Sequence, residues 1–488
     1  MAILKQAPRA ERLERSDMQG LLASAYGHLS CAAYLLLRIN DGQAVAAGTW
    51  LGDTLGLVTT AAAKQAGWSL NVALTYHGLA ALGLDSDALH TFPTAFRDGM
   101  ASPARRRILG DRGDNDASTW RWGGPRTPAI HVVLLLYADQ PDHLADLLAR
   151  QRARLGERQG LSEVLLLEAG RQPDSREHFG FADGISQPRI EGLDRGSTSA
   201  DRIKAGEFVL GYQNQYGLPA DVPMVSPARD SRNVLPAIRP DHHDLGRNGS
   251  YLVFRQLAQD VAGLWTYLDH ATRDASGISD PSAQTRLAAK MVGRWPSGTP
   301  LVKAPDADPL QGRPGADGIT GDNAFGYAEA DPHGFGCPVG AHIRRAFPRD
   351  ALVSTSTSPS QALTAANRHR LLRRGRAYGE RLENRYVDDQ NERGLHFLCF
   401  NAHLERQFEF VQQTWINNPV FGDLDGEVDP LIGDQSRVAG RMTLPADPVR
   451  SRVHGLRQFV TVKGGAYFFL PGLRALRYLA QMRGFPQS

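Results

Sequence analysis

Between Ala33 and Gly170 the chain alternates short apolar segments with stretches of helical periodicity, and this alternation limits the folds open to it. The apolar segments are rich in Leu, Val and Tyr and have the length of strands. They run from Ala33 to Ile39, Leu70 to Tyr76, Ile130 to Tyr137 and Val164 to Glu168. Strands that alternate with helices in this way predict an α+β domain, with helices packed on one face of a largely antiparallel sheet.

The clearest helix in this region is predicted from Pro141 to Leu155. Leu144, Leu147, Leu148 and Leu155 recur there at helical spacing, while the intervening arginines face elsewhere. The segment therefore has one apolar face that can cover a sheet.

A second α+β region begins at Glu207. Its predicted strands are Phe208 to Tyr212, Ser250 to Phe254, His396 to Asn401 and Phe459 to Phe469, with helices at Asp260 to Thr272 and Leu404 to Ile416. Two long segments, Gln213 to Asn248 and Pro296 to Pro338, are rich in residues typical of loops. Long loops within compact domains often build functional sites.

Composition narrows the class of protein further. A chain of 488 residues predicts two domains, and a net charge of +3 is too small to indicate nucleic acid as a partner. No apolar run reaches the roughly 20 residues that cross a membrane. Three distant cysteines and an N-terminus without an apolar signal region predict a cytoplasmic protein.

Three polar clusters could carry chemistry, and each has a purely structural alternative. Asp183 lies in the segment His178 to Pro188 between Gly180 and Gly184, which suits either a ligand site or an Asx-turn. His342 lies in the segment Cys337 to Asp350, as a ligand or as a partly exposed histidine in a basic loop. The arginine-rich segment Asn367 to Gly379 could equally be a solvated helix end.

Taken together, these segments strongly resemble the dye-decolourising (Dyp-type) haem peroxidases, in particular the longer members of that family. The resemblance covers nearly the whole chain. Its segments are Asp17 to Gly20, Gly180 to Gly184, Leu245 to Tyr251, Lys290 to Ser297, Cys337 to Asp350, Phe397 to Asn401 and Arg406 to Asn418. This ordered set is far more specific than any one of its members.

The resemblance implies two ferredoxin-like α+β domains with antiparallel sheets and peripheral helices. The expected domains are residues 1–195, ending in the GxxDG segment, and residues 196–488, which would hold haem b. By the same resemblance His342 is the proximal iron ligand, Asp183 is the distal acid-base residue, and Arg373 is the distal arginine.

These residue types suit peroxide chemistry. Asp183 could take a proton from one peroxide oxygen and return it to the other, before heterolysis yields water and a ferryl intermediate. Arg373 would polarise the O–O bond and stabilise the departing negative charge. A neutral imidazole such as that of His342 suits one face of a five-coordinate haem iron.

Three further residues are predicted around the haem. The second ring nitrogen of His342 needs an acceptor, and Glu405 borders the apolar stripe of its helix more closely than Glu409 does. Arg345 and Arg349 are predicted to contact the haem propionates because of their charge.

The sequence thus predicts an enzyme that uses hydrogen peroxide to oxidise bulky aromatic donors, such as dyes and phenols, and that could form a homo-oligomer. Two alternatives stay open: a haem-iron-releasing or chlorite-dismutase-like enzyme of similar fold, and a haem-binding protein with little turnover. The presence of both Asp183 and Arg373 favours catalysis, because haem binding alone requires neither residue.

Overall fold

Four antiparallel strands form the sheet of the N-terminal half. They are β1 (Cys31–Ile39), β2 (Trp68–Leu74), β3 (Val132–Ala138) and β4 (Leu161–Gly170), and they lie in the order β2-β3-β1-β4. The computed structural model describes residues 12–63, 67–194, 202–311 and 323–482. All four apolar segments of this half are confirmed as strands, within a few residues at their ends.

Strand β1 shows why these segments are apolar on both faces. Ala33, Leu35 and Leu37 belong to a core cluster under the outer helices, whereas Tyr34 and Leu36 belong to a second cluster on the opposite face. Side chains of a strand alternate between the faces of the sheet. Because both faces are buried, the sequence shows an almost continuous apolar run instead of an alternation.

The C-terminal half repeats this strand order. Its strands β10 (Ser250–Gln259), β12 (Arg376–Tyr378), β13 (Gly394–Asn401) and β16 (Val460–Leu470) lie in the order β16-β10-β13-β12, and the short β11 (Leu372–Arg373) also pairs with β13. The strands expected at Ser250, His396 and Phe459 are thereby confirmed.

The two sheets are joined to each other at both edges. Leu74 of β2 pairs with Phe469 of β16, and Gly170 of β4 pairs with Ala377 of β12. With the pairing of β10 to β13, the eight strands close into a ring. The sequence analysis did not predict this closure, because it depends on edge contacts between residues hundreds of positions apart.

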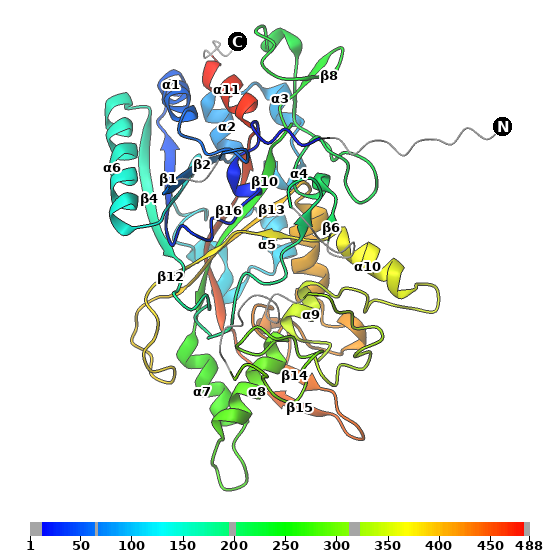
Figure 1. The fold of residues 1–488 in the computed structure, drawn as a ribbon. Coiled ribbons are helices and arrows are strands. Elements are labelled where there is room, and N and C mark those ends of the chain that lie inside the picture. The colour runs from blue at the N-terminus through cyan, green and yellow to red at the C-terminus, as the bar shows by residue number, and fades with distance from the viewer. Residues whose placement is uncertain (1–11, 64–66, 195–201, 312–322, 483–488) are drawn as a thin grey trace, which may run out of the picture.

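Helices lie beside this ring of strands and beyond its ends (Figure 1). They are α1 (Ala44–Leu55), α2 (Tyr76–Leu82), α3 (Ser86–His90), α4 (Thr94–Asp98), α5 (Pro103–Leu109), α6 (Pro141–Arg158), α7 (Val261–Ala271), α8 (Pro281–Val292), α9 (His342–Ala346), α10 (Pro359–Asn367), α11 (Leu473–Gln481) and the π-helical turns η7 (Glu405–Glu409) and η8 (Val411–Ile416). The helices predicted from Pro141, Asp260 and Leu404 are confirmed. None of the helices in the described ranges is long and apolar enough to span a membrane.

The C-terminal helix packs against the N-terminal half. Figure 1 shows α11 beside α1 and α2, at the end of the molecule away from α7 and α8. A methyl group added at Gly48 of α1 would lie 3.3 Å from the carbonyl oxygen of Ala480, a tight contact that shows how closely the two helices approach. The two halves of the chain therefore share both a ring of strands and a helical layer.

The remaining strands are short. They are β5 (Arg189–Ile190), β6 (Arg202–Ile203), β7 (Met224–Val225), β8 (Ala237–Arg239), β9 (His242–Asp244), β14 (Arg441–Leu444) and β15 (Ser451–His454). Strands β7 to β9 form a small sheet within the long loop-rich segment after Gln213.

One strand assigned from the sequence is wrong. The segment Phe208 to Tyr212 is a buried turn and not a strand, because Gly211 takes a left-handed conformation with φ of 87°. For the arginine-rich segment, the alternative of a solvated helix end at Arg373 does not hold, since α10 stops at Asn367 and Arg373 belongs to β11. The predicted domain boundary between residues 195 and 196 lies outside the described residues.

Candidate active site

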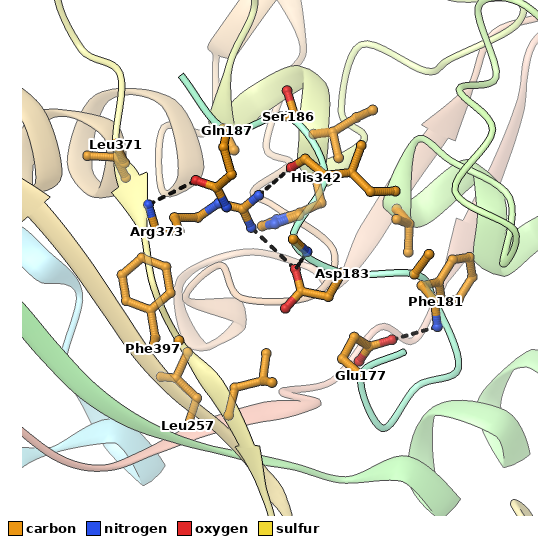
Figure 2. A pocket seen from close by; sticks show the side chains of 18 of the residues that line it. Glu177, Phe181, Asp183, Ser186, Gln187, Leu257, His342, Leu371, Arg373 and Phe397 are labelled. Atoms are coloured by element: carbon orange, nitrogen blue, oxygen red, sulfur yellow. Dashed lines mark hydrogen bonds and ion pairs between the residues drawn. The ribbon is translucent and has the colours of Figure 1, made fainter. Parts of the chain in front are cut away.

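A cavity of about 580 Å³ opens beside the C-terminal strands. Its walls come from the loop after β4, the start of α9, strands β11 to β13 and η8. Most of the side chains that line it are apolar, among them Phe179, Phe181, Leu257, Phe397, Phe408, Val411, Ile416, Leu431 and Ile432. Figure 2 shows Asp183, Arg373 and His342 gathered within this cavity. The structure thus brings together all three residues to which the sequence analysis assigned direct roles.

His342 is the first residue of α9, and a buried carboxylate orients its ring. Its Nδ1 donates to Oδ2 of Asp429 at 2.8 Å, and the Asp429 side chain is fully buried. The backbone amides of Leu431 and Ile432 each donate to the other Asp429 oxygen at 2.9 Å. These bonds fix the imidazole and leave Nε2 as the ring nitrogen available to a ligand in the cavity.

His342 and Asp429 each shift the pKa of the other. Burial disfavours the imidazolium, but the Asp429 carboxylate outweighs burial and holds the pKa of His342 above its ordinary value. Burial likewise opposes ionisation of Asp429, but His342 and the two amides hold the pKa of this carboxyl below its ordinary value. Asp429 is therefore a charged hydrogen-bond acceptor.

The prediction that Glu405 is the acceptor for His342 is wrong. Glu405 does not line the cavity, and its Oε1 accepts from the backbone amide of Ala95 at 2.9 Å. The helical wheel could rank only the residues of one helix, whereas Asp429 lies 87 residues beyond His342 on a separate loop. Its only signal in the sequence is an isolated acid within the apolar run from Val428 to Ile432.

Asp183 and Arg373 face each other from different elements. Their Oδ1 and Nη1 atoms are 3.6 Å apart, an ion pair without a direct hydrogen bond. Nη2 of Arg373 donates to the carbonyl of Ile185 at 2.7 Å, and its backbone amide donates to Oε1 of Gln187 at 3.1 Å (Figure 2). The loop that carries Asp183 therefore also holds the arginine.

Both side chains stay accessible from the cavity, with 44% of the Asp183 side chain and 35% of the Arg373 side chain exposed. Gly180 and Gly184 have φ of 100° and 78°, values that favour glycine. The two glycines thus shape the turn that presents Asp183.

The cavity also contains a carboxyl group that the sequence analysis missed. Glu177 accepts hydrogen bonds from the backbone amides of Phe179 and Phe181 and from the side chain of Gln259. Burial, with a smaller contribution from the charge of Asp183, raises the pKa of Glu177 to about 7. An acid shortly before a Phe-Gly-Phe sequence was the available signal.

The two arginines predicted at the propionates have different environments. Arg345 is fully buried and donates to the carbonyls of Trp415, Asn418 and Glu427, away from the cavity lining. The prediction that Arg345 contacts a haem propionate is wrong, because its guanidinium points into the protein and donates its hydrogen bonds to these carbonyls. Arg349 does line the cavity.

Another arginine that lines the cavity, Arg370, lies close to Arg349. The two guanidinium groups lie 4.0 Å (Arg370) and 5.2 Å (Arg349) from the centre of the Phe347 ring. Nη2 of Arg370 also donates to the carbonyl of Ser186 at 3.1 Å. The pair gives one wall of the cavity a positive charge.

Within the ranges that the structure describes, no group of three or more His, Cys, Asp or Glu side chains could hold a metal ion by itself.

Several known proteins similar to this chain are dye-decolorizing peroxidases. The chain is 31% identical over 452 residues to the dye-decolorizing peroxidase msp1 of Mycetinis scorodonius. The alignment covers 87% of this chain and 80% of that protein. It is 31% identical over 486 residues to the multifunctional dye peroxidase DyP2 of an Amycolatopsis species, covering 91% and 92% of the two chains.

A solved structure supports the same relationship. A dye-decolorizing peroxidase in complex with 2,6-dimethoxyphenol superimposes with a TM-score of 0.75 at 25% identity, covering 96% of this chain and all of that one. No protein-family model matches the chain. The extent of the sequence identity nevertheless leaves no doubt about the relationship: the chain belongs to the dye-decolorizing peroxidases, which are oxidoreductases.

Proposed function

We propose that this protein is a haem peroxidase that uses hydrogen peroxide to oxidise bulky aromatic donors such as dyes and phenols. One observation carries the proposal: a single cavity contains His342, backed by Asp429, together with the Asp183–Arg373 pair. The names of the relatives, and the phenol bound in one of them, support the class of donor.

The residues of the cavity fit one haem b per chain. His342 would be the iron ligand, since its Nδ1 is held by Asp429 and its Nε2 is left for a metal. The apolar walls suit the macrocycle, and Arg349 and Arg370 would hold the propionates. When bound, the haem supplies the redox centre for peroxide reduction and for one-electron oxidation of donors.

Asp183 would move the proton that peroxide cleavage requires. Its carboxylate takes a proton from one oxygen of hydrogen peroxide and returns it to the other, which leaves as water. Arg373 provides a permanent positive charge close to this carboxylate and to the O–O bond. Both residues are held by the backbone of the same loop, which limits their reorganisation during the reaction.

Asp429 would make the imidazole of His342 a stronger donor to iron. We expect Asp429→Asn to raise the reduction potential of the haem-loaded protein. A neutral amide accepts the hydrogen bond from Nδ1 more weakly than a carboxylate does, so the imidazole would donate less electron density to the iron. We also expect weaker haem binding, on the order of 10- to 100-fold. Spectroelectrochemical titration and haem transfer to an acceptor protein measure the two effects.

Glu405→Gln is the matched control for this experiment. It makes the same chemical change at the acid that does not contact His342, and should leave the potential and the haem affinity at their wild-type values. A shift in Glu405→Gln that equals the shift in Asp429→Asn would contradict the assignment.

The finer architecture belongs to the same proposal. The shared strand order of the two halves supports two ferredoxin-like domains, with haem in the C-terminal one. Division at residue 195, the cytoplasmic location and the homo-oligomer stay predictions.

The test is the absorption spectrum of purified, haem-loaded protein. We expect a Soret band that shifts when one equivalent of hydrogen peroxide is added, followed by bleaching of an anthraquinone dye. Free haem at the same concentration, with peroxide and dye, serves as the control. A protein that binds haem tightly but neither shifts its spectrum nor bleaches more dye than free haem would be a haem-binding protein and not a peroxidase.

A further inference from the structure

The loop that presents Asp183 is folded around a second carboxylate. Arg176 and Ala182 pair as an antiparallel bridge, and the amide of Asp183 donates to the carbonyl of Ser175 at 3.1 Å. Between them, the side chain of Glu177 turns back into the loop (Figure 2). The segment from residue 176 to 182 is therefore a closed turn with a carboxylate at its centre.

Three N–H donors converge on this carboxylate. Phe181 donates its amide to Oε1 at 2.8 Å, and Phe179 donates its amide to Oε2 at 2.9 Å. The side-chain amide of Gln259 donates to Oε2 at 2.6 Å. All three donors are uncharged, so the arrangement gives directional bonds rather than charge neutralisation.

Gln259 makes this a link between the loop and the sheet. It is the last residue of β10, and its backbone amide donates to the carbonyl of Arg393 at 2.8 Å. A second tie joins the loop to the C-terminal half, because the amide of Ala182 donates to the carbonyl of Pro296 at 3.1 Å. The turn before Asp183 is thereby fixed on both sides.

The Asp183 side chain has weaker support of its own. Its Oδ1 accepts from the amide of the next residue, Gly184, at 2.6 Å, and its contact with Arg373 is an ion pair at 3.6 Å. The position of its carboxylate consequently depends on the backbone of the loop. A displacement of about 1 Å in a catalytic group can reduce a rate by two orders of magnitude.

We propose that Glu177 is a positioning residue, which holds the distal loop so that Asp183 meets peroxide beside Arg373. This inference rests on the role proposed for Asp183. Burial of a carboxylate is unfavourable unless hydrogen bonds compensate it, and the three donors offset part of that cost while they tie the side chain to the loop. Glutamine cannot replace Glu177, because its NH2 group would face one of the N–H donors.

The test compares Glu177→Gln and Gln259→Leu with Glu168→Gln, which makes the same change at an exposed acid upstream on β4. Hydrogen exchange of the peptide spanning residues 176–183 should become faster in the first two variants and stay unchanged in the control. The second-order rate constant for peroxide should fall on the order of ten- to a hundredfold in Glu177→Gln. The KM for the dye should not change.

The decisive comparison uses the Asp183→Asn background. A residue that acts through Asp183 has little further effect once that carboxylate is gone, so the double variant should match Asp183→Asn alone. An equal loss from Glu177→Gln in both backgrounds would overturn the inference. If Asp183→Asn reacts with peroxide like the wild type, the role proposed for Asp183 is wrong. The hydrogen-exchange result then tests Glu177 separately. Unchanged exchange in both Glu177→Gln and Gln259→Leu would show that Glu177 does not position the loop.

Discussion

Replacing His342 with alanine is expected to remove nearly all peroxidase activity and the stable binding of haem. The imidazole of His342 is the proposed iron ligand, and a buried carboxylate holds it in one orientation. Loss of the ligand should also change the Soret band of any haem that remains. Haem content and absorption spectra of the purified variant measure both effects.

Two further measurements make this prediction specific. His333→Ala, a change at an exposed histidine nine residues earlier, should retain haem and activity. Added imidazole should partly restore the spectrum of His342→Ala, because Asp429 is still present to orient a free ring. Full haem loading with an unaltered spectrum in His342→Ala would refute the ligand assignment.

The second large effect is expected at the distal pair. Asp183→Asn and Arg373→Leu should each lower kcat/KM for hydrogen peroxide by roughly 10² to 10⁴, the range typical of a lost acid-base or charge-stabilising group. Haem content and the resting spectrum should stay close to those of the wild type. The two losses should not add, since the residues act on the same O–O bond and contact each other.

The surface pair Asp174–Arg381 offers matched controls. Nη1 of Arg381 lies 2.7 Å from Oδ2 of Asp174, and both side chains are substantially exposed. Asp174→Asn and Arg381→Leu make the same chemical changes in an ion pair that contributes little. Wild-type reactivity in the double variant Asp183→Asn/Arg373→Leu would reject the proposed proton transfer.

Local pattern was sufficient for most of the strands and helices. The apolar runs that became β1 and β3 satisfy the length and composition of strands whichever partner they meet. Phe208 to Tyr212 is equally apolar, but a left-handed Gly211 turns the chain there. A buried turn and a buried strand have the same composition, so only the backbone conformation separates them.

Some residues of the candidate site could be found from the sequence and others could not. Asp183, His342 and Arg373 were identified through the resemblance to a known family, which depends on the ordered set of segments and not on any one of them. Asp429 was missed, and Glu405 was chosen in its place by its position on one helix, whereas hydrogen bonding depends on distance in space. Arg345 was chosen by its charge alone, which does not show whether a guanidinium faces the cavity or the protein interior.

The sequence by itself therefore determined the α+β class, most of the long strands of both halves and the three residues to which the proposal gives direct chemical roles. The tertiary structure alone decided that the two sheets close into one ring, that Asp429 orients His342, and that Glu177 holds the loop of Asp183. The physical reason is the range of the interactions. Periodicity and turn chemistry act over a few residues, but edge pairing and buried hydrogen bonds join groups that only the folded chain brings together.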